Sequence, residues 1–384
     1  MHQIIPAPSA TATTAGITLG SVGLLMLGLQ PLLLGVLLTE HRLTVPQLTQ
    51  AATVELLVLG ATAGLMGGLL PHRALRAIAV LGCGILVAGN AASLAATGFM
   101  FVAGRALAGL GGGITVWIAI GVITHGRAPA RLSGLFLALQ TAAQALLAAI
   151  LPISLMPTYG ANGGFIALAA ISAFAVVTIP FLPAALPTLP KPEAGHGGLN
   201  LAGMLGLASA FLFMAGIVGA WVFVDAVAVL NHITPIVAHY AVALALVSQV
   251  IGALAATVLA HRLPVAITLV TAALGCLAAV AVMAAPPGDW AFMAAVLLYG
   301  FLWLFTLPFQ IPLLFAADPT RRAAMLLAGA QLLGGSAGPQ ITGLFATETT
   351  LWPALAAAAG LFGLCLLCTV ATAARIGRKE AVLF

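Results

Sequence analysis

Two residues of opposite charge lie inside long apolar stretches of this sequence. Glu55 stands about five residues into one stretch, and Arg105 has a similar position in another. At 1.5 Å per helical residue, Glu55 would lie roughly 7 Å from the end of its helix. In lipid, a lone charge at that depth costs on the order of 2–3 kcal/mol, which a Glu55–Arg105 pair would relieve. A static salt bridge and a carboxyl that exchanges protons both fit this spacing.

A second group of ionisable residues follows a later apolar stretch. Asp225 ends that stretch, His232 lies in the connection that follows, and His239 opens the next stretch. Because histidine titrates between pH 5 and 8, these three residues are candidates for the place where protons enter. A solvated loop cluster is the alternative. Their spacing matches no compact metal-ligand motif, and no glycine-rich phosphate loop is present, so we expect neither a metal nor a cofactor.

The composition shows what must position these residues. The chain is 62% hydrophobic and only 5% charged, whereas soluble domains are about 25% charged. Lipid must therefore cover most of its apolar surface. The net charge of +5 comes from short basic connections, which suit the anionic cytoplasmic face of a bilayer. No block of clustered Lys or Arg indicates nucleic-acid binding.

The apolar stretches predict an all-α membrane protein. At about 20 residues per crossing, we expect twelve transmembrane helices. Residues 1–183 would form an N-terminal six-helix bundle and 200–384 a C-terminal one, joined by a Pro- and Gly-rich cytoplasmic linker at 184–199. The expected spans are 15–38, 50–70, 76–97, 101–123, 132–156, 163–183, 200–224, 237–260, 265–285, 291–315, 323–345 and 352–373.

Basic residues predict the orientation of these spans, since Lys and Arg favour the cytoplasmic side. With both termini in the cytoplasm, eleven of the thirteen Lys and Arg residues lie on that side. Arg42 falls in an outer connection, and Arg105 lies within a span. The cytoplasmic set is Arg73, Arg76, Arg127, Arg131, Lys191, Arg262, Arg321, Arg322, Arg375, Arg378 and Lys379.

Two sequence echoes indicate an internal duplication. His72-Arg73 recurs as His261-Arg262, 189 positions later, and Arg131 with Gln140 recurs as Arg322 with Gln331, 191 positions later. Both offsets are close to half of the 384 residues. A doubled membrane bundle is the architecture of secondary transporters, which bind their solute between the halves.

Three segments resemble motifs of the major facilitator superfamily. Residues 67–76, with Arg73, resemble its loop signature, although Pro71 or His72 replaces the usual carboxylate; Arg262 marks a more reduced second copy. Residues 105–113 are similar to its fourth-helix motif of an arginine followed by glycines, here Gly109 and Gly113. Residues 334–343, with Gly338 and Pro339, look like the Gly-Pro motif that exporters of the family carry in span 5, here displaced to span 11.

The resemblance implies which residues could line a solute path, because spans 1, 4, 7 and 10 line the cavity in that family, helped by spans 2, 5, 8 and 11. Gln140 and Gln144 share one helix face, and Gln331, which repeats Gln140, could face it from the other half. Helix–helix contact is the alternative role for such amides. The polar and aromatic candidates are Gln30, Trp117, Gln140, Gln144, Trp221, Gln249, Tyr299, Trp303, Gln310 and Gln331.

Taken together, these patterns favour a proton-coupled transporter of a small neutral or amphipathic organic solute, working by alternating access. Apart from Arg105 no cation lies within a span, which disfavours a strongly anionic solute. We favour export over import, a monomer, and a bacterial inner membrane. An uncoupled facilitator or importer is one alternative, and a non-transporting sensor or assembly factor on the same fold is another. No constellation of catalytic residues predicts an enzyme.

Overall fold

The computed structural model describes residues 8–69, 74–185, 199–260, 262–284, 288–347 and 349–382, and these are helical apart from short connections. Eleven helices in this part of the chain are long and apolar enough to cross a membrane. The chain is therefore an integral, multi-pass membrane protein. These helices match eleven of the predicted spans; the predicted span 323–345 corresponds to α14 (Arg322–Gly343), which is rich in Gly, Ala and Gln and does not reach the same apolarity.

The chain divides into two compact units. Unit 1 comprises Met1–Leu29 and Val54–Gly195, and unit 2 comprises Gln30–Thr53 and His196–Phe384. Residues 30–53, from the first half of the sequence, thus belong to unit 2. Most of the predicted linker, residues 186–198, lies outside the described residues.

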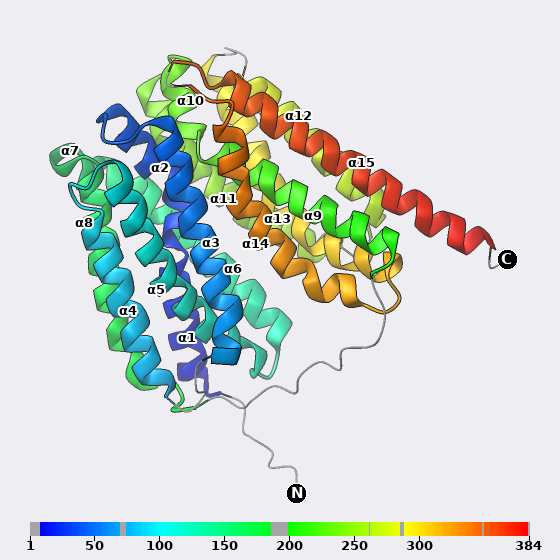
Figure 1. Cartoon of the computed structure of the whole chain (residues 1–384), viewed down its shortest axis with the longest axis horizontal. Coiled ribbons are helices and arrows are strands. Elements are labelled where there is room, and N and C mark those ends of the chain that lie inside the picture. The colour runs from blue at the N-terminus through cyan, green and yellow to red at the C-terminus, as the bar shows by residue number, and fades with distance from the viewer. Residues whose placement is uncertain are drawn as a thin grey trace, which may run out of the picture. The chain divides into compact units, whose positions relative to one another are not determined.

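Unit 1 contains the helices of predicted spans 3 to 6 and parts of spans 1 and 2. Helix α4 packs between α5 and α8, and α1 packs against α5 (Figure 1). A core of buried apolar residues joins α1, α4, α5 and η2. The elements are α1 (Ala10–Gly23), α2 (Leu25–Thr39), α3 (Val45–Leu69), α4 (Leu75–Ala92), α5 (Gly98–Thr124), α6 (Pro129–Ile150), η1 (Leu151–Ile153), α7 (Met156–Tyr159), α8 (Ala161–Phe174) and η2 (Ala175–Phe181), of which α2 and α3 are shared with unit 2.

Unit 2 contains the helices of predicted spans 7 to 12. Helix α9 packs against α14 and α15, α11 packs against α13, and α12 packs against α13 and α15 (Figure 1). The elements, besides α14, are α9 (Leu201–Trp221), α10 (Val224–Leu230), α11 (Pro235–Leu259), α12 (Val265–Ala284), α13 (Asp289–Ala317) and α15 (Trp352–Val382).

Predicted span 1 is divided at Leu24 into α1 and α2. The carbonyl oxygen of Leu24 accepts a hydrogen bond from Nε2 of Gln144, at 2.7 Å, and another from the backbone N–H of Leu27, at 3.1 Å. Because a free backbone group is costly in lipid, the Gln144 amide stabilises this interruption. The nearest proline, Pro31, lies inside α2 and not at the break.

The duplication is also visible in backbone geometry. His41 and His232 have φ values of 54° each, and each ends its helix with the same pair of hydrogen bonds: His41 N to Leu38 O and Arg42 N to Leu37 O, then His232 N to Val229 O and Ile233 N to Ala228 O. This is a Schellman motif with histidine in the left-handed position. The spacing between the two histidines equals that between Arg131 and Arg322.

Asp318 shapes the start of α14. Its Oδ2 accepts from the Ala323 N–H at 3.0 Å, and its Oδ1 accepts from the Thr320 N–H at 3.1 Å and hydroxyl at 2.7 Å. Burial of the carboxyl opposes ionisation, but hydrogen bonds from Ala323, Thr320 and Arg322 outweigh it and hold the pKa of Asp318 below its usual value. The ionised carboxylate therefore caps the helix.

We expect Asp318→Asn to lower stability by about 1 kcal/mol at pH 7, because the amide replaces one of the two accepting oxygens. Since the folded pKa lies below the unfolded one, the contribution of the carboxylate is complete above pH ~4 and is lost as the pH falls through the folded value. Thermal unfolding of both proteins between pH 7 and pH 2.5 should show the gap closing in acid. A gap of constant size would contradict this role.

Candidate functional site

Two glycines bring the charged residues together in unit 1. A side chain at Gly109 would overlap the backbone carbonyl of Glu55, and one at Gly89 would overlap the backbone of Ala108. Glycine at these positions lets α5 approach both α3 and α4 closely, as small residues do in membrane bundles. Glu55 on α3 and Arg105 on α5 are thereby placed in one buried region.

The structure contains the Glu55–Arg105 ion pair. Nη1 of Arg105 lies 3.2 Å from Oε1 of Glu55, and the two residues are 1% and 5% exposed. Nη2 of Arg105 also donates to the carbonyl of Gly89 at 3.2 Å, to Oδ1 of Asn90 at 2.9 Å and to Oγ of Ser93 at 2.9 Å, while Nε donates to the same Oγ at 3.1 Å. Most hydrogen bonds of the guanidinium therefore go to α4.

Aromatic rings complete the surroundings of Arg105. Its guanidinium lies 5.0 Å from the ring centre of Phe165 and 5.9 Å from that of Phe101. The two rings meet edge to face, with centres 5.5 Å apart. Cation–π contacts of this kind, out of water, favour the charged guanidinium.

Glu55 is held much less firmly than its partner. Only Oε1 bonds to Arg105, and Oε2 is buried without a hydrogen-bond partner among the described residues. If Glu55 takes up a proton or moves away, Arg105 keeps its bonds to Gly89, Asn90 and Ser93. The arrangement can therefore change the protonation or position of Glu55 without leaving a bare guanidinium.

Unit 2 repeats this helix packing without the charges. A side chain at Gly300 on α13 would overlap the carbonyl of Ala245 on α11, just as one at Gly109 would overlap the carbonyl of Glu55. By this match, Ala245 takes the place of Glu55. Val296, four residues before Gly300 as Arg105 is before Gly109, takes the place of Arg105. Ala245 and Val296 are both fully buried. The packing of two such helices thus does not require an ion pair.

Sequence reasoning missed Asn90, Ser93, Phe101 and Phe165. A signal was available for two of them, because Asn90 and Ser93 are polar, three residues apart, and near the end of an apolar span. Side chains three apart share a helix face, so they could have been matched to Arg105. The two phenylalanines resemble ordinary apolar residues and gave no signal.

The predicted glutamines have different surroundings. Gln144 donates to the Leu24 carbonyl at the break between α1 and α2. Gln331 donates to Oε1 of Gln310 at 2.8 Å within unit 2, and Gln140 lies in unit 1. Among the described residues, both amide atoms of Gln30, Oε1 of Gln140 and Nε2 of Gln249 are buried without partners. These three amides are the ones that a polar solute could satisfy.

The predicted aromatic residues are buried. Trp221 and Trp303 meet edge to face with ring centres 5.8 Å apart, and the hydroxyl of Tyr299 donates to the backbone carbonyls of Gly216 and Ile217. Trp117 lies in the core of unit 1. These contacts belong to helix packing within each unit.

Asp225, His232 and His239 do not form one cluster in the part of the chain that the structure describes. Asp225 is half-buried beside Gly35, and His232 is exposed in its left-handed position. His239 packs edge-on against Tyr240, with ring centres 4.6 Å apart. No hydrogen bond or ion pair between described atoms links these three residues.

The predicted gating and packing residues occupy several places. Gly113 faces the Leu59 carbonyl of α3, and Gly338 faces the Ala215 carbonyl of α9. Pro339 lies inside α14, and Arg262 is exposed after α11. Arg73 lies outside the described residues.

Comparisons with known proteins place the fold. No protein-family model and no curated protein sequence matches the chain. A mutant of the nucleoside transporter NupG has a TM-score of 0.71 at 11% identity, covering 94% of this chain and 99% of NupG. A second NupG structure gives 0.66 at 14% identity, covering 94% and 98% of the two chains. The human organic anion transporter MFSD10 gives 0.64 at 15% identity, covering 95% and 100%.

The chain therefore has the same fold as these transporters, as the resemblance to the major facilitator superfamily predicted. The names of these neighbours describe transporters of nucleosides and of organic anions.

Proposed function

We propose that this protein carries a small neutral organic solute across the membrane by alternating access, and that Glu55 exchanges the proton that drives the cycle. The observation that carries the proposal is the buried Glu55–Arg105 pair, which unit 2 replaces by Ala245 and Val296. Burying two charges costs desolvation energy. A pair that the helix packing does not need, at a depth where charges are expensive, is typical of a functional site.

The hydrogen bonds support different roles for the two residues in this proposal. Arg105 is the fixed charge, because α4 supplies most of its acceptors. Glu55 is the exchanging group, and the boundary between the units crosses α3 between Thr53 and Val54, directly before it. A rearrangement of α3 that separates Glu55 from Arg105 removes the charge that favours the carboxylate. Proton uptake and release would then follow the conformational cycle.

A neutral solute is supported by the distribution of charge and amides. Arg105 is buried and hydrogen-bonded, and the other described cations lie in connections or near the ends of helices. The amide atoms of Gln30, Gln140 and Gln249 that have no partner among the described residues include both donors and acceptors. Nucleosides, the solutes in the name of the neighbour NupG, are neutral molecules with many such groups. We therefore propose nucleosides as the first solutes to test.

The positive charges of the connections support the orientation with both termini in the cytoplasm. The Gly-Pro segment of α14 gives no argument for export, because Gly338 is accounted for by its packing on α9. We therefore propose no direction of transport, which a measurement of solute flux in both directions would determine.

Counterflow in proteoliposomes tests the transport function without assuming a driving ion. Vesicles loaded with unlabelled nucleoside should accumulate labelled nucleoside from outside, at least tenfold above protein-free vesicles. A dicarboxylate of similar size should give no accumulation. Exchange of the anion in preference to neutral solutes would contradict the proposed solute class, and the absence of exchange across a broad panel would favour a non-transporting protein.

A further inference from the structure

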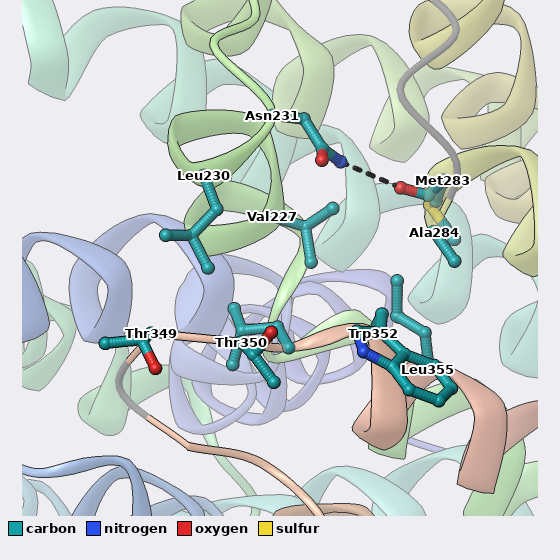
Figure 2. Close-up of a pocket in the computed structure, with 10 residues that line it drawn as sticks. Val227, Leu230, Asn231, Met283, Ala284, Thr349, Thr350, Trp352 and Leu355 are labelled. Atoms are coloured by element: carbon teal, nitrogen blue, oxygen red, sulfur yellow. Dashed lines mark hydrogen bonds between the residues drawn. The ribbon is translucent and has the colours of Figure 1, made fainter.

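A cavity at one end of unit 2 belongs to no part of the site described so far. It has a volume of about 210 Å³ and lies where α10, the last residues of α12, the first turn of α15 and the preceding turn meet (Figure 2). The described residues that line it belong to unit 2, whereas the Glu55–Arg105 pair is in unit 1.

The floor of the cavity is apolar and the rim is open. Val227, Met283 and Leu355 on the floor are at most 3% exposed, whereas Trp352 at the rim is 62% exposed. Trp352 and Leu355, both drawn in Figure 2, lie three residues apart at the start of α15. A ligand can therefore enter beside the indole and rest on buried aliphatic side chains.

Asn231 is held in a fixed orientation at the edge of the cavity. Its Nδ2 donates to the backbone carbonyl of Met283 at 3.0 Å (Figure 2), which ties the end of α10 to the end of α12. This bond assigns Oδ1 as the remaining acceptor. Within the described residues, no hydrogen bond uses Oδ1.

Thr350 supplies a second polar group. Its backbone N–H and carbonyl pair with Thr347, at 3.3 and 3.0 Å, which fixes the turn before α15. Its hydroxyl forms no hydrogen bond with a described residue and can donate or accept. None of the described residues that line the cavity carries a charge.

We propose that this cavity binds a small neutral molecule that consists of one aromatic ring with a hydroxyl or amide group. A dry cavity of about 150 Å³ holds benzene, so 210 Å³ leaves room for a ring and one polar substituent. The ring lies between Trp352 and the aliphatic floor, with the edge or offset contacts that aromatic pairs prefer. The substituent bonds to Oδ1 of Asn231 and the hydroxyl of Thr350. The proposal does not depend on the transport function.

Binding of 4-fluorobenzyl alcohol to the purified full chain in lipid nanodiscs, followed by ¹⁹F NMR, tests the proposal. We expect saturable binding that is about tenfold weaker in Asn231→Leu, because one hydrogen bond is lost. Ala284→Leu fills the cavity and should abolish binding. Ala281→Leu, the same change at an exposed position of α12 outside the lining, is the matched control and should bind like the wild type.

Thermal unfolding of each variant establishes that it is folded before its binding is scored. The charged analogue 4-fluorobenzoate should bind at least about tenfold more weakly than the alcohol, since burying an unpaired charge is costly. Binding that does not saturate, or that is equal in the Ala284→Leu and Ala281→Leu proteins, would overturn the proposal. Equal binding of the benzoate would overturn the neutral class of ligand.

Discussion

Arg105→Met should destabilise the protein by about 3–5 kcal/mol, the largest effect that we expect from one substitution in unit 1. The change removes the one hydrogen-bond partner that the described residues give to buried Glu55, and it also removes the donors to Gly89, Asn90 and Ser93. The measurement is the fraction of monodisperse protein after heating in detergent, compared with the wild type.

The double variant Glu55→Ala/Arg105→Val is the matched control, because it gives α3 and α5 the pair of residues that α11 and α13 use. We expect it to recover most of the stability lost in Arg105→Met, since replacing both charges of a buried pair by apolar groups is often neutral. Glu55→Ala alone should cost less than Arg105→Met, because Arg105 keeps its α4 acceptors. A double variant as unstable as Arg105→Met would show that the fold itself requires the pair.

The second large effect is expected at the contact between α9 and α14. Gly334 faces the carbonyl of Phe211 and Gly338 the carbonyl of Ala215, so a Cβ at either position overlaps the backbone of α9. Thr342 also donates to the Gly219 carbonyl at 3.0 Å. Gly338→Ala must push two closely packed helices apart, and we expect a loss on the order of 1–3 kcal/mol, measured by thermal unfolding.

Gly329→Ala provides the control on the same helix. A Cβ at Gly329 meets no neighbouring atom within 4 Å, so the change adds helix propensity alone and should stabilise by about 0.5–1 kcal/mol. The two alanine substitutions on α14 therefore have opposite expected signs. Equal effects would mean that the close contact with α9 is absent from the folded protein.

The charged pair could be predicted from the sequence because charges inside apolar spans are rare. Glu55 and Arg105 stood out by type and depth alone, and the structure joins them. The acceptors of Arg105 on α4, Asn90 and Ser93, were harder to predict, because asparagine and serine occur in many helices without such a partner. Their shared helix face marks Asn90 and Ser93 as candidate partners, but their role also depends on which span packs against Arg105, and one sequence does not give the packing of its spans.

The roles of the glutamines depended on details that periodicity does not resolve. Gln140 and Gln144 share a face, yet Gln144 bonds to the Leu24 carbonyl and Oε1 of Gln140 has no described partner. The break at Leu24 that makes the difference follows Gly23 and has no proline, and Gly23 is one of several glycines in this span, so the sequence does not single it out. Gln331, which repeats Gln140 in the sequence, donates to Gln310 within unit 2. A shift of one residue along a helix turns a side chain toward different neighbours.

Two short repeated motifs indicated the duplication in the sequence, but they did not show which functional residues differ between the two copies. The sequence alone did not align Glu55 with Ala245 or Arg105 with Val296, because few residues around them are shared. The glycine contacts of Gly109 and Gly300 supply that alignment. Comparison of the two copies then distinguishes the glycines, which the helix packing uses in both units, from the charged pair of unit 1, which Ala245 and Val296 replace in unit 2.

Substrate-driven proton flux shows whether Glu55 exchanges the proton during transport. Proteoliposomes with an internal pH dye receive a solute that supports counterflow, and the wild type is compared with Glu55→Gln, which keeps the size of the side chain and removes its titration. We expect the wild type to move protons with the solute, and Glu55→Gln to retain counterflow while losing at least about nine-tenths of the proton flux. Proton flux that is unchanged in Glu55→Gln, or solute movement without protons in the wild type, would contradict the proton-exchanging role of Glu55.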